Sequence, residues 1–327
     1  MLVFTIRRLI QAIPILFGAS LLTFWLMSIP ADPVTVEFAG RNPRPPQGTI
    51  DAEMHRFRLD ESFWAQYWDW IKGIFHGNWG PALDKNANIF HDMMRHFGVT
   101  TRLIVLALIV AIVLAVLTGV MSAIKQYSVR DYTFTFLGFV FLSMPTFWIA
   151  QLLKTIAVNF NTSTGTHFFG TLGAYSIPQP DGFWNRIVDY AGHLVLPTIS
   201  LALITYAGLS RFQRASMLEV MNSDYVRLAR AKGISQRRVL TRHMLRTALI
   251  PMTTATALTI AVFFGGTIIT ETVFNWNGMG VYTIDAISSH DKYIVLATLM
   301  LTGFIVIIGN LVADILYAVL DPRIRYA

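Results

Sequence analysis

Six long apolar windows constrain this chain more than any other feature of its sequence. An apolar helix of about 20 residues is long enough to cross the hydrocarbon core of a bilayer. The windows run over residues 9–29, 103–124, 132–153, 194–210, 247–270 and 293–320, and only the last contains a charged residue, Asp314. Because a segment in lipid must satisfy its own backbone hydrogen bonds, the sequence predicts an all-α membrane protein with six transmembrane helices.

The overall composition agrees with a chain that faces lipid and other helices. Hydrophobic residues make up 54% of the sequence and charged residues 14%, and the mean hydropathy is +0.51. A soluble domain needs far more charge to cover its surface. The sequence contains no cysteine, which excludes a disulfide framework, a thiolate metal site and a thiol nucleophile.

The positions of the basic residues predict the orientation in the membrane. Lysine and arginine resist translocation, so they gather in short cytoplasmic connections. If the N-terminus is cytoplasmic, fifteen of them lie in cytoplasmic segments and only three in the short outer loops, 154–193 and 271–292. We therefore expect both termini in the cytoplasm. The net charge of +7 then reflects topology, and we expect no nucleic-acid partner.

The first 94 residues are expected to form an N-terminal addition, made of one membrane helix and an extracytoplasmic segment. The first window follows Arg7 and Arg8 but is longer than the apolar region of a cleavable signal peptide, so we interpret it as a retained anchor. In the outer segment, aromatic residues share one face of a helix predicted over 63–75. That face either lies at the membrane interface, where Trp and Tyr gather, or docks an external partner, and we prefer the first interpretation.

The predicted cytoplasmic segment between the fourth and fifth windows holds nine basic and two acidic residues. Asn222 and Ser223 can cap a short helix over 224–232. Gly233 can supply the left-handed residue that ends this helix, and Ser235 can cap a second helix that leads into the fifth window. We thus expect a two-turn helix suspended between two membrane helices.

The short helix is expected to present one face to a partner. Small residues, among them Ala229, Ala231 and Gly233, permit close approach of another backbone. The residues that share the face at helical spacing are Tyr225, Leu228, Ala229 and Lys232. In the alternative interpretation, the basic residues only satisfy the positive-inside rule and contact anionic lipid headgroups. Caps at both ends of the helix favour insertion into a groove of a partner protein.

Five stretches of the sequence resemble a known family. They are DYVRLARAKGISQRRVLTRHMLRTALIP (224–251), ETVFNWNGMG (271–280), HLVLPTISLAL (193–203), LSMPTFWIA (142–150) and LYAVLDPRIR (316–325). With them the chain resembles the B-type inner-membrane permease subunits of binding-protein-dependent ABC importers, in the dipeptide and oligopeptide branch. The general importer signature has Glu-Ala-Ala, whereas this chain reads Ala229-Arg230-Ala231, which is the form of the peptide branch.

The resemblance implies a type I ABC importer permease fold and a division of the chain. Residues 95–318 would form the ABC transporter transmembrane core with five helices, and residues 319–327 a cytoplasmic tail. The segment at about 223–233 would be the coupling helix, which fits a groove on a cytoplasmic ATPase. The residues expected at that contact are Asp224, Tyr225, Leu228, Ala229, Lys232 and Gly233.

The resemblance also implies an assembly in the bacterial inner membrane, surrounded by membrane lipid. This chain would form half of the translocation pathway for dipeptides or oligopeptides, in a heterodimer with a homologous second permease subunit. Two cytoplasmic ABC ATPase subunits would bind ATP and Mg. An extracytoplasmic substrate-binding protein would deliver the peptide and largely set its length.

The sequence lacks the motifs of an enzyme or a metal site. No phosphate-binding loop of the pattern G-x-x-x-x-G-K-[ST] occurs, so we expect no catalytic residue and no cofactor on this chain. His91 and His96 have no third ligand at a suitable spacing, and no metal site is predicted. The energy source is expected on another polypeptide.

Prolines and acids within or beside the windows have two interpretations each. Pro145 and Pro251 interrupt helix hydrogen bonds and are expected to kink helices along the pathway. Asp314 and Glu271 are interpreted as structural anchors in preference to ion-coupling sites. An ion-coupled secondary carrier, the alternative function, would need polar sites near mid-membrane, where the windows carry almost no charge. A membrane-embedded enzyme would need a constellation of catalytic groups that the sequence does not contain.

Overall fold

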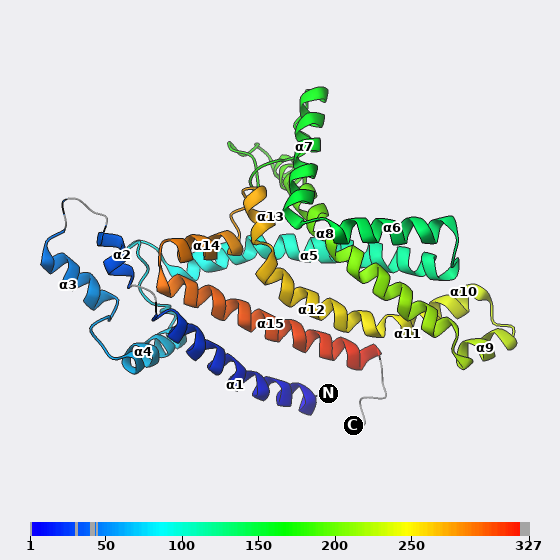
Figure 1. Ribbon diagram of the computed structural model, residues 1–327, viewed down its shortest axis with the longest axis horizontal. Coiled ribbons are helices and arrows are strands. Elements are labelled where there is room, and N and C mark those ends of the chain that lie inside the picture. Colours follow the sequence, from blue (N-terminus) through cyan, green and yellow to red (C-terminus); the bar gives the residue numbers. More distant parts are fainter. Residues whose placement is uncertain (1, 30–31, 40–42, 44, 321–327) are drawn as a thin grey trace. The chain divides into compact units, whose positions relative to one another are not determined.

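The computed structural model describes residues 2–29, 32–39, 43 and 45–320, and this part of the chain is helical with no strand (Figure 1). It divides into two units. The core unit comprises residues 101–276 and 308–320, and the N-terminal unit comprises residues 2–100 and 277–307. The expected boundary at residue 94 lies near the first of these limits. Residues 277–307 nevertheless group with the N-terminal unit, because Tyr293 and its neighbours belong to the apolar cluster of that unit.

The N-terminal unit is held together by aromatic residues. Its helices are α1 (Leu2–Leu26), α2 (Pro33–Ala39), α3 (Gln47–Arg56), α4 (Phe63–Phe75), α14 (Met279–Ser288) and the first parts of α5 (Ile89–Ile124) and α15 (Lys292–Leu320). Phe24 of α1 is fully buried. Its ring centroid lies 5.5, 5.4 and 5.5 Å from those of Phe63, Tyr67 and Trp70 in α4. Such edge-on and tilted pairs stabilise a core beyond the area that they bury.

The aromatic residues of α4 are divided between the inside and the surface of this unit. Tyr67 and Trp70 are 0% and 3% exposed, and the hydroxyl of Tyr67 lies 2.8 Å from that of Ser20 in α1. The aromatic residues left exposed are Trp64, Trp68 and Phe75. The predicted aromatic face therefore packs in part on its own chain, and only its remainder is open to a membrane interface or a partner.

The core unit is arranged around α8 (Phe183–Met221). This helix contacts α6 (Val129–Ser143), α7 (Thr146–Thr164), α11 (Leu245–Ala248), α12 (Ile250–Gly266) and α13 (Ile268–Val273). After α8 the chain forms α9 (Asp224–Ala231), α10 (Gln236–Arg238) and the π-helical segment η1 (Val239–Met244), as Figure 1 shows for α9 and α10. A Cβ at Gly119 of α5 would lie 2.9 Å from the Ser210 carbonyl oxygen. Glycine therefore permits the close crossing of α5 and α8, which is the ordinary use of small residues between membrane helices.

Four described helices are long and apolar enough to cross a membrane. They contain the segments Leu9–Leu26, Ile89–Ile124, Phe183–Met221 and Lys292–Val312. Helices α6 and α7 meet the same test only as a pair, and they are bent by 105° at their junction. The window 132–153 is therefore divided at Pro145, the position where the sequence predicts a kink. Pro145 has no N–H and disfavours helical backbone in the residue before it, and Met144 is extended with ψ 131°.

The fifth window is also interrupted. Residues 247–270 fall on α11, α12 and α13, which are separated at Leu249 and Thr267. Pro251 lies in the first turn of α12, where a missing N–H leaves no helix hydrogen bond unmade. The N–H groups of Leu249, Thr253, Thr267 and Glu271 still donate to the carbonyl oxygen four residues earlier, so the helical hydrogen bonds run across both points. The count of six spans stays a prediction.

Gly80 lets the chain pass directly over Tyr293 in the N-terminal unit. Its φ of 103° lies in the left-handed region that favours glycine, and a Cβ would lie 2.3 Å from Cδ1 of Tyr293. That tyrosine is only 3% exposed. Its ring stacks on Phe57 at 6.1 Å, and its hydroxyl donates to the Phe57 carbonyl oxygen at 3.2 Å. These contacts leave the Tyr293 ring little room to move away from an added Cβ.

Gly80→Ala is expected to destabilise the N-terminal unit more than Gly77→Ala. Both glycines have positive φ, 103° and 78°, so each substitution costs about 1 kcal/mol in backbone strain. Only Gly80 adds a steric clash, which costs about 1–3 kcal/mol, because a Cβ at Gly77 meets no atom within 4 Å. Thermal unfolding in detergent, followed by tryptophan fluorescence, measures the two Tm values. Equal falls in Tm would contradict the close packing over Tyr293.

Candidate functional site

Helix α9 begins at Asp224 as predicted, but the expected side chains do not cap it. Ser223 precedes the helix with extended backbone, φ −71° and ψ 149°. Its hydroxyl donates instead to the Val220 carbonyl oxygen at 2.6 Å, and Asn222 Nδ2 donates to that of Leu218 at 3.1 Å. The prediction of side-chain capping is wrong, because both side chains donate to carbonyl groups in the last turn of α8. Ser235 likewise precedes α10 without a side-chain cap.

Gly233 follows α9 in the left-handed conformation, with φ 74°, which confirms the prediction for this residue. The Ile234 N–H donates to the Ala229 carbonyl oxygen at 3.3 Å, and the Gly233 N–H donates to that of Arg230 at 3.0 Å. These are the two hydrogen bonds of a Schellman motif. Ile234 also packs against the apolar cluster that contains Ala229. Hydrogen bonds and burial together fix the direction of the chain after α9.

The inner face of α9 is packed against its own chain. Val226 and Ala229 are 0% and 6% exposed. They belong to a cluster with Met217 of α8, Val239 and Met244 of η1, and Ala123 of α5. The expectation that Ala229 shares the exposed face of α9 is therefore wrong. Its small side chain allows α9 to lie close to the rest of the core unit.

Helix α9 also carries an exposed apolar face, formed by Tyr225 and Leu228. These side chains are 43% and 56% exposed, and cationic Arg227, Arg230 and Lys232 are exposed beside them. Arg227 and Asp224 form an ion pair at 3.6 Å, which contributes little to stability at such an exposed position. Exposed apolar groups among cations are typical of a surface that meets a protein partner or an anionic membrane.

Asp131, Ser122 and Arg214 form a polar cluster that joins α6, α5 and α8. Nε and Nη2 of Arg214 each lie 2.8 Å from one carboxylate oxygen of Asp131. Ser122 donates to the same carboxylate, and Arg214 Nε lies 3.0 Å from the Ser122 hydroxyl. The Asp131 side chain is 4% exposed, so its charge is stabilised by these partners and little by water.

This polar cluster was not predicted from the sequence. The signal that could have found it is an acid, Asp131, at the edge of one apolar window and a base, Arg214, just beyond another. Met217, which lies under α9, is the residue one turn after Arg214 in α8. The cluster therefore holds the helix end from which α9 projects.

The remaining residues singled out from the sequence lie apart from α9. Glu271 is fully buried in α13, while the side chain of Asp314 lies outside the described part of the structure. Pro145 and Pro251 lie at helix starts, as described above. Pathway roles for the prolines and anchoring roles for the acids stay predictions. Within the described residues, no group of three or more His, Asp and Glu side chains is arranged to hold a metal ion.

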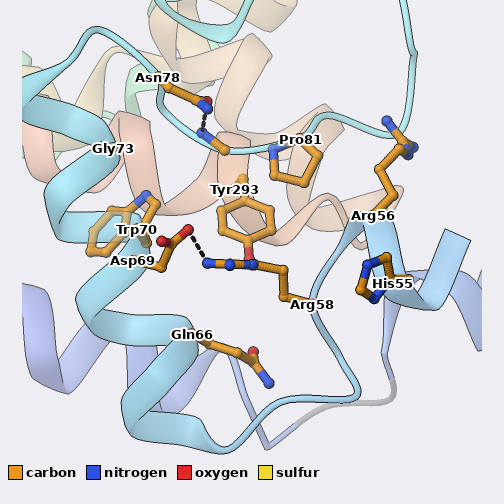
Figure 2. A pocket seen from close by; sticks show the side chains of 11 residues that line it. His55, Arg56, Arg58, Gln66, Asp69, Trp70, Gly73, Asn78, Pro81 and Tyr293 are labelled. Carbon is orange, nitrogen blue, oxygen red and sulfur yellow. Dashed lines mark hydrogen bonds and ion pairs between the residues drawn. The ribbon is translucent and has the colours of Figure 1, made fainter.

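A polar pocket of about 340 Å³ lies in the N-terminal unit, between α4 and the start of α15 (Figure 2). Trp70, Tyr293 and Pro81 form part of its wall. The ion pairs made by its charged lining residues are Arg58–Asp69, Arg58–Glu61 and Arg56–Glu53. Nδ1 of His55 lies 2.9 Å from a carboxylate oxygen of Asp60. Burial raises the pKa of Glu53, but hydrogen bonds from Lys85 and Arg56 outweigh it, so the pKa lies below its usual value. The charges of the pocket therefore already stabilise one another.

Asp131→Asn and Arg214→Leu are each expected to destabilise the core unit by about 3 kcal/mol, because each leaves a buried partner without its counter-charge. The double variant removes both charges, and its loss should be clearly smaller than the sum of the two single losses. Thermal unfolding of the four proteins gives the coupling as a double-mutant cycle. Additive losses would contradict a direct interaction between the two side chains.

Comparison with protein families gives two matches that follow one another along the chain. The profile of the family described as "Binding-protein-dependent transport system inner membrane component" matches residues 111–326. A second profile, for the N-terminal part of such membrane components, matches residues 1–89. The change from one profile to the other falls close to the expected boundary at residue 94.

Curated relatives match over almost the full length. The oligopeptide transport system permease protein OppB of Mycobacterium tuberculosis is 39% identical over 319 residues, 98% of either chain. The oligopeptide transport system permease protein AppB of Bacillus subtilis is 35% identical over 328 residues, 100% of either chain. The dipeptide transport system permease protein DppB of Escherichia coli is 34% identical over 340 residues, covering 100% of this chain and 99% of that protein. The resemblance inferred from the sequence is confirmed, and the chain belongs to the family of binding-protein-dependent transport system inner membrane components.

Proposed function

We propose that this chain forms half of the translocation pathway of an ATP-driven importer for dipeptides or oligopeptides. Relatives that match at least 98% of its length are named as permease proteins of oligopeptide or dipeptide transport systems. The structural observation that carries the proposal is α9, a short helix with a buried inner face and an exposed apolar face.

In this proposal α9 is the coupling helix. Tyr225 and Leu228 would enter a groove on a cytoplasmic ATPase, since exposed aromatic and aliphatic side chains on a well-supported element are suited to fill a partner's pocket. Ala229 would act from the inner face by holding α9 against the core unit. Gly233 would turn the chain away from the contact through its Schellman motif. Closure of the ATPases on ATP would then move the helix ends behind α9.

The implied assembly contains several other chains. The sequence has no phosphate-binding loop, so ATP and Mg would be held by two separate ATPase subunits. A homologous second permease would complete the pathway, and an extracytoplasmic binding protein would deliver the peptide. An ion-coupled secondary carrier is not favoured, because the family to which the chain belongs is described by its dependence on a binding protein.

We also propose six membrane spans with both termini in the cytoplasm. Helices α6 and α7 would together form the third span, and α11 to α13 the fifth. The break at Pro145 would then face neighbouring helices or the pathway, since lipid cannot satisfy freed backbone groups. The surplus of basic residues between the fourth and fifth windows supports this orientation.

The double variant Tyr225→Ala with Leu228→Ala removes the exposed apolar face of α9. It is expected to lower peptide uptake and co-purification of ATPase subunits by about tenfold or more. Both side chains are exposed, so the Tm of the chain should change little. Arg227→Gln is the matched control, because Arg227 is an exposed residue of the same helix that does not belong to its apolar face, and this variant should retain uptake. Normal uptake by the double variant would contradict docking through α9.

Replacement of Gly233 by a bulky residue, for example Gly233→Val, tests the turn after α9. A β-branched residue is strained at φ 74°, so the direction of the chain should change and uptake should be abolished. The variant should still be found in the membrane fraction by immunoblotting, because the apolar windows are unaltered. Full uptake together with normal membrane levels would contradict a role for this turn in coupling.

The substrate class is tested on the complete complex, reconstituted in liposomes with its binding protein. We expect ATP-dependent accumulation of a labelled dipeptide or pentapeptide, with competition by unlabelled peptides and none by free amino acids. Accumulation that follows a proton gradient in the absence of ATP would contradict the importer and support the secondary carrier.

A further inference from the structure

An open groove of about 520 Å³ lies on the core unit between α6 and α8. Its walls include Thr135 and Phe139 of α6, and Arg211, Phe212 and Arg214 of α8. A Cβ added at Gly208, which also lines the groove, would meet no atom within 4 Å. A side chain added at Gly208 would therefore have room to extend over the groove.

The two arginines of the groove differ in their partners. Arg214 is committed to Asp131 through Nε and Nη2. Arg211 is exposed, and its guanidinium carbon lies 4.5 Å from the centre of the Phe139 ring. Within the described residues, Arg211 has no carboxylate at ion-pair distance. The groove thus carries one cation without a counter-charge.

Aromatic and polar side chains surround Arg211. Phe139 of α6 and Phe212 of α8 are 53% and 43% exposed, and Thr135 of α6 lies in the same groove. Both walls belong to helices that qualify as membrane spans, α8 alone and α6 together with α7. Arg211 directly follows the apolar window 194–210. It therefore lies where the apolar part of α8 ends, which in the proposed topology is the level of the cytoplasmic headgroups.

A cation at this level beside exposed aromatic rings favours a particular occupant. Basic pockets between membrane helices bind anionic headgroups, and guanidinium groups match the geometry of phosphate oxygens. The exposed phenylalanines offer apolar surface for acyl chains. A headgroup with net negative charge neutralises the arginine. A zwitterionic headgroup brings its own positive group close to the arginine and is therefore less favoured.

We propose that this groove binds the phosphate of one anionic phospholipid, with Arg211 as its principal contact. The lipid would bridge α6 and α8 beside the Asp131–Arg214 ion pair, and it would thereby support the base of α9. The proposal rests on the membrane location of the chain and is independent of the solute that is transported.

Native mass spectrometry of the purified chain, titrated with phosphatidylglycerol and separately with phosphatidylcholine, tests the proposal. Phosphatidylglycerol should be retained in preference. Arg211→Gln should lower its retention about fivefold, the factor that corresponds to about 1 kcal/mol for one cation near a membrane surface. Arg238→Gln is the matched control, because Arg238 is an exposed cation of α10 outside the groove, and it should leave retention unchanged.

Gly208→Leu provides a second variant that keeps every charge. The added side chain should fill the groove and lower phosphatidylglycerol retention, while Tm measurements confirm that both variants are folded. Equal losses with Arg211→Gln and Arg238→Gln would overturn the proposal in favour of diffuse charge attraction. Displacement of the lipid by millimolar inorganic phosphate would overturn it in favour of a free-anion site. Impaired pairing with a second permease, with lipid retention intact, would make the groove a subunit interface and overturn it too.

Discussion

The ion pair between Asp131 and Arg214 is the interaction on which the α9 segment most depends. It joins α6 to α8, and through Ser122 it reaches α5. Met217, one turn further along α8, is fully buried with Val226 of α9. Because separating α6 from α8 would leave a buried charge uncompensated, these helix ends are expected to move together. A force applied to the exposed face of α9 would therefore act on three helices at once.

The features that could be predicted from the sequence depend on neighbouring residues. Apolar windows of about 20 residues leave a helix as the simplest solution in lipid, so the helical class followed directly. Gly233 could be assigned a left-handed conformation because glycine adopts it without a steric cost. The predicted capping by Ser223 was wrong, and the cause is also local. The end of α8 and the start of α9 compete for the same Ser223 hydroxyl.

The features that could not be predicted depend on residues far apart in the chain. Helical spacing places Ala229 beside Tyr225, but only tertiary packing shows that the rest of the core unit covers Ala229 and leaves Tyr225 open. Arg214 and Asp131 are 83 positions apart. A kink at Pro145 could be expected from the proline itself. A hydropathy window measures length and polarity only, however, so it gives neither the size of that bend, 105°, nor the grouping of residues 277–307 with the N-terminal unit.

The basic residues after the fourth window show why a charge count describes topology better than function. Arg227 meets Asp224 in water, where the pair contributes little. Arg214 donates through Nε and Nη2 to the buried carboxylate of Asp131. Arg211 lies over the ring of Phe139, with no carboxylate at ion-pair distance in the described part of the chain. The same charge interacts more strongly as the local dielectric constant falls, so of these three arginines Arg211 is the one that gains most from an external anion.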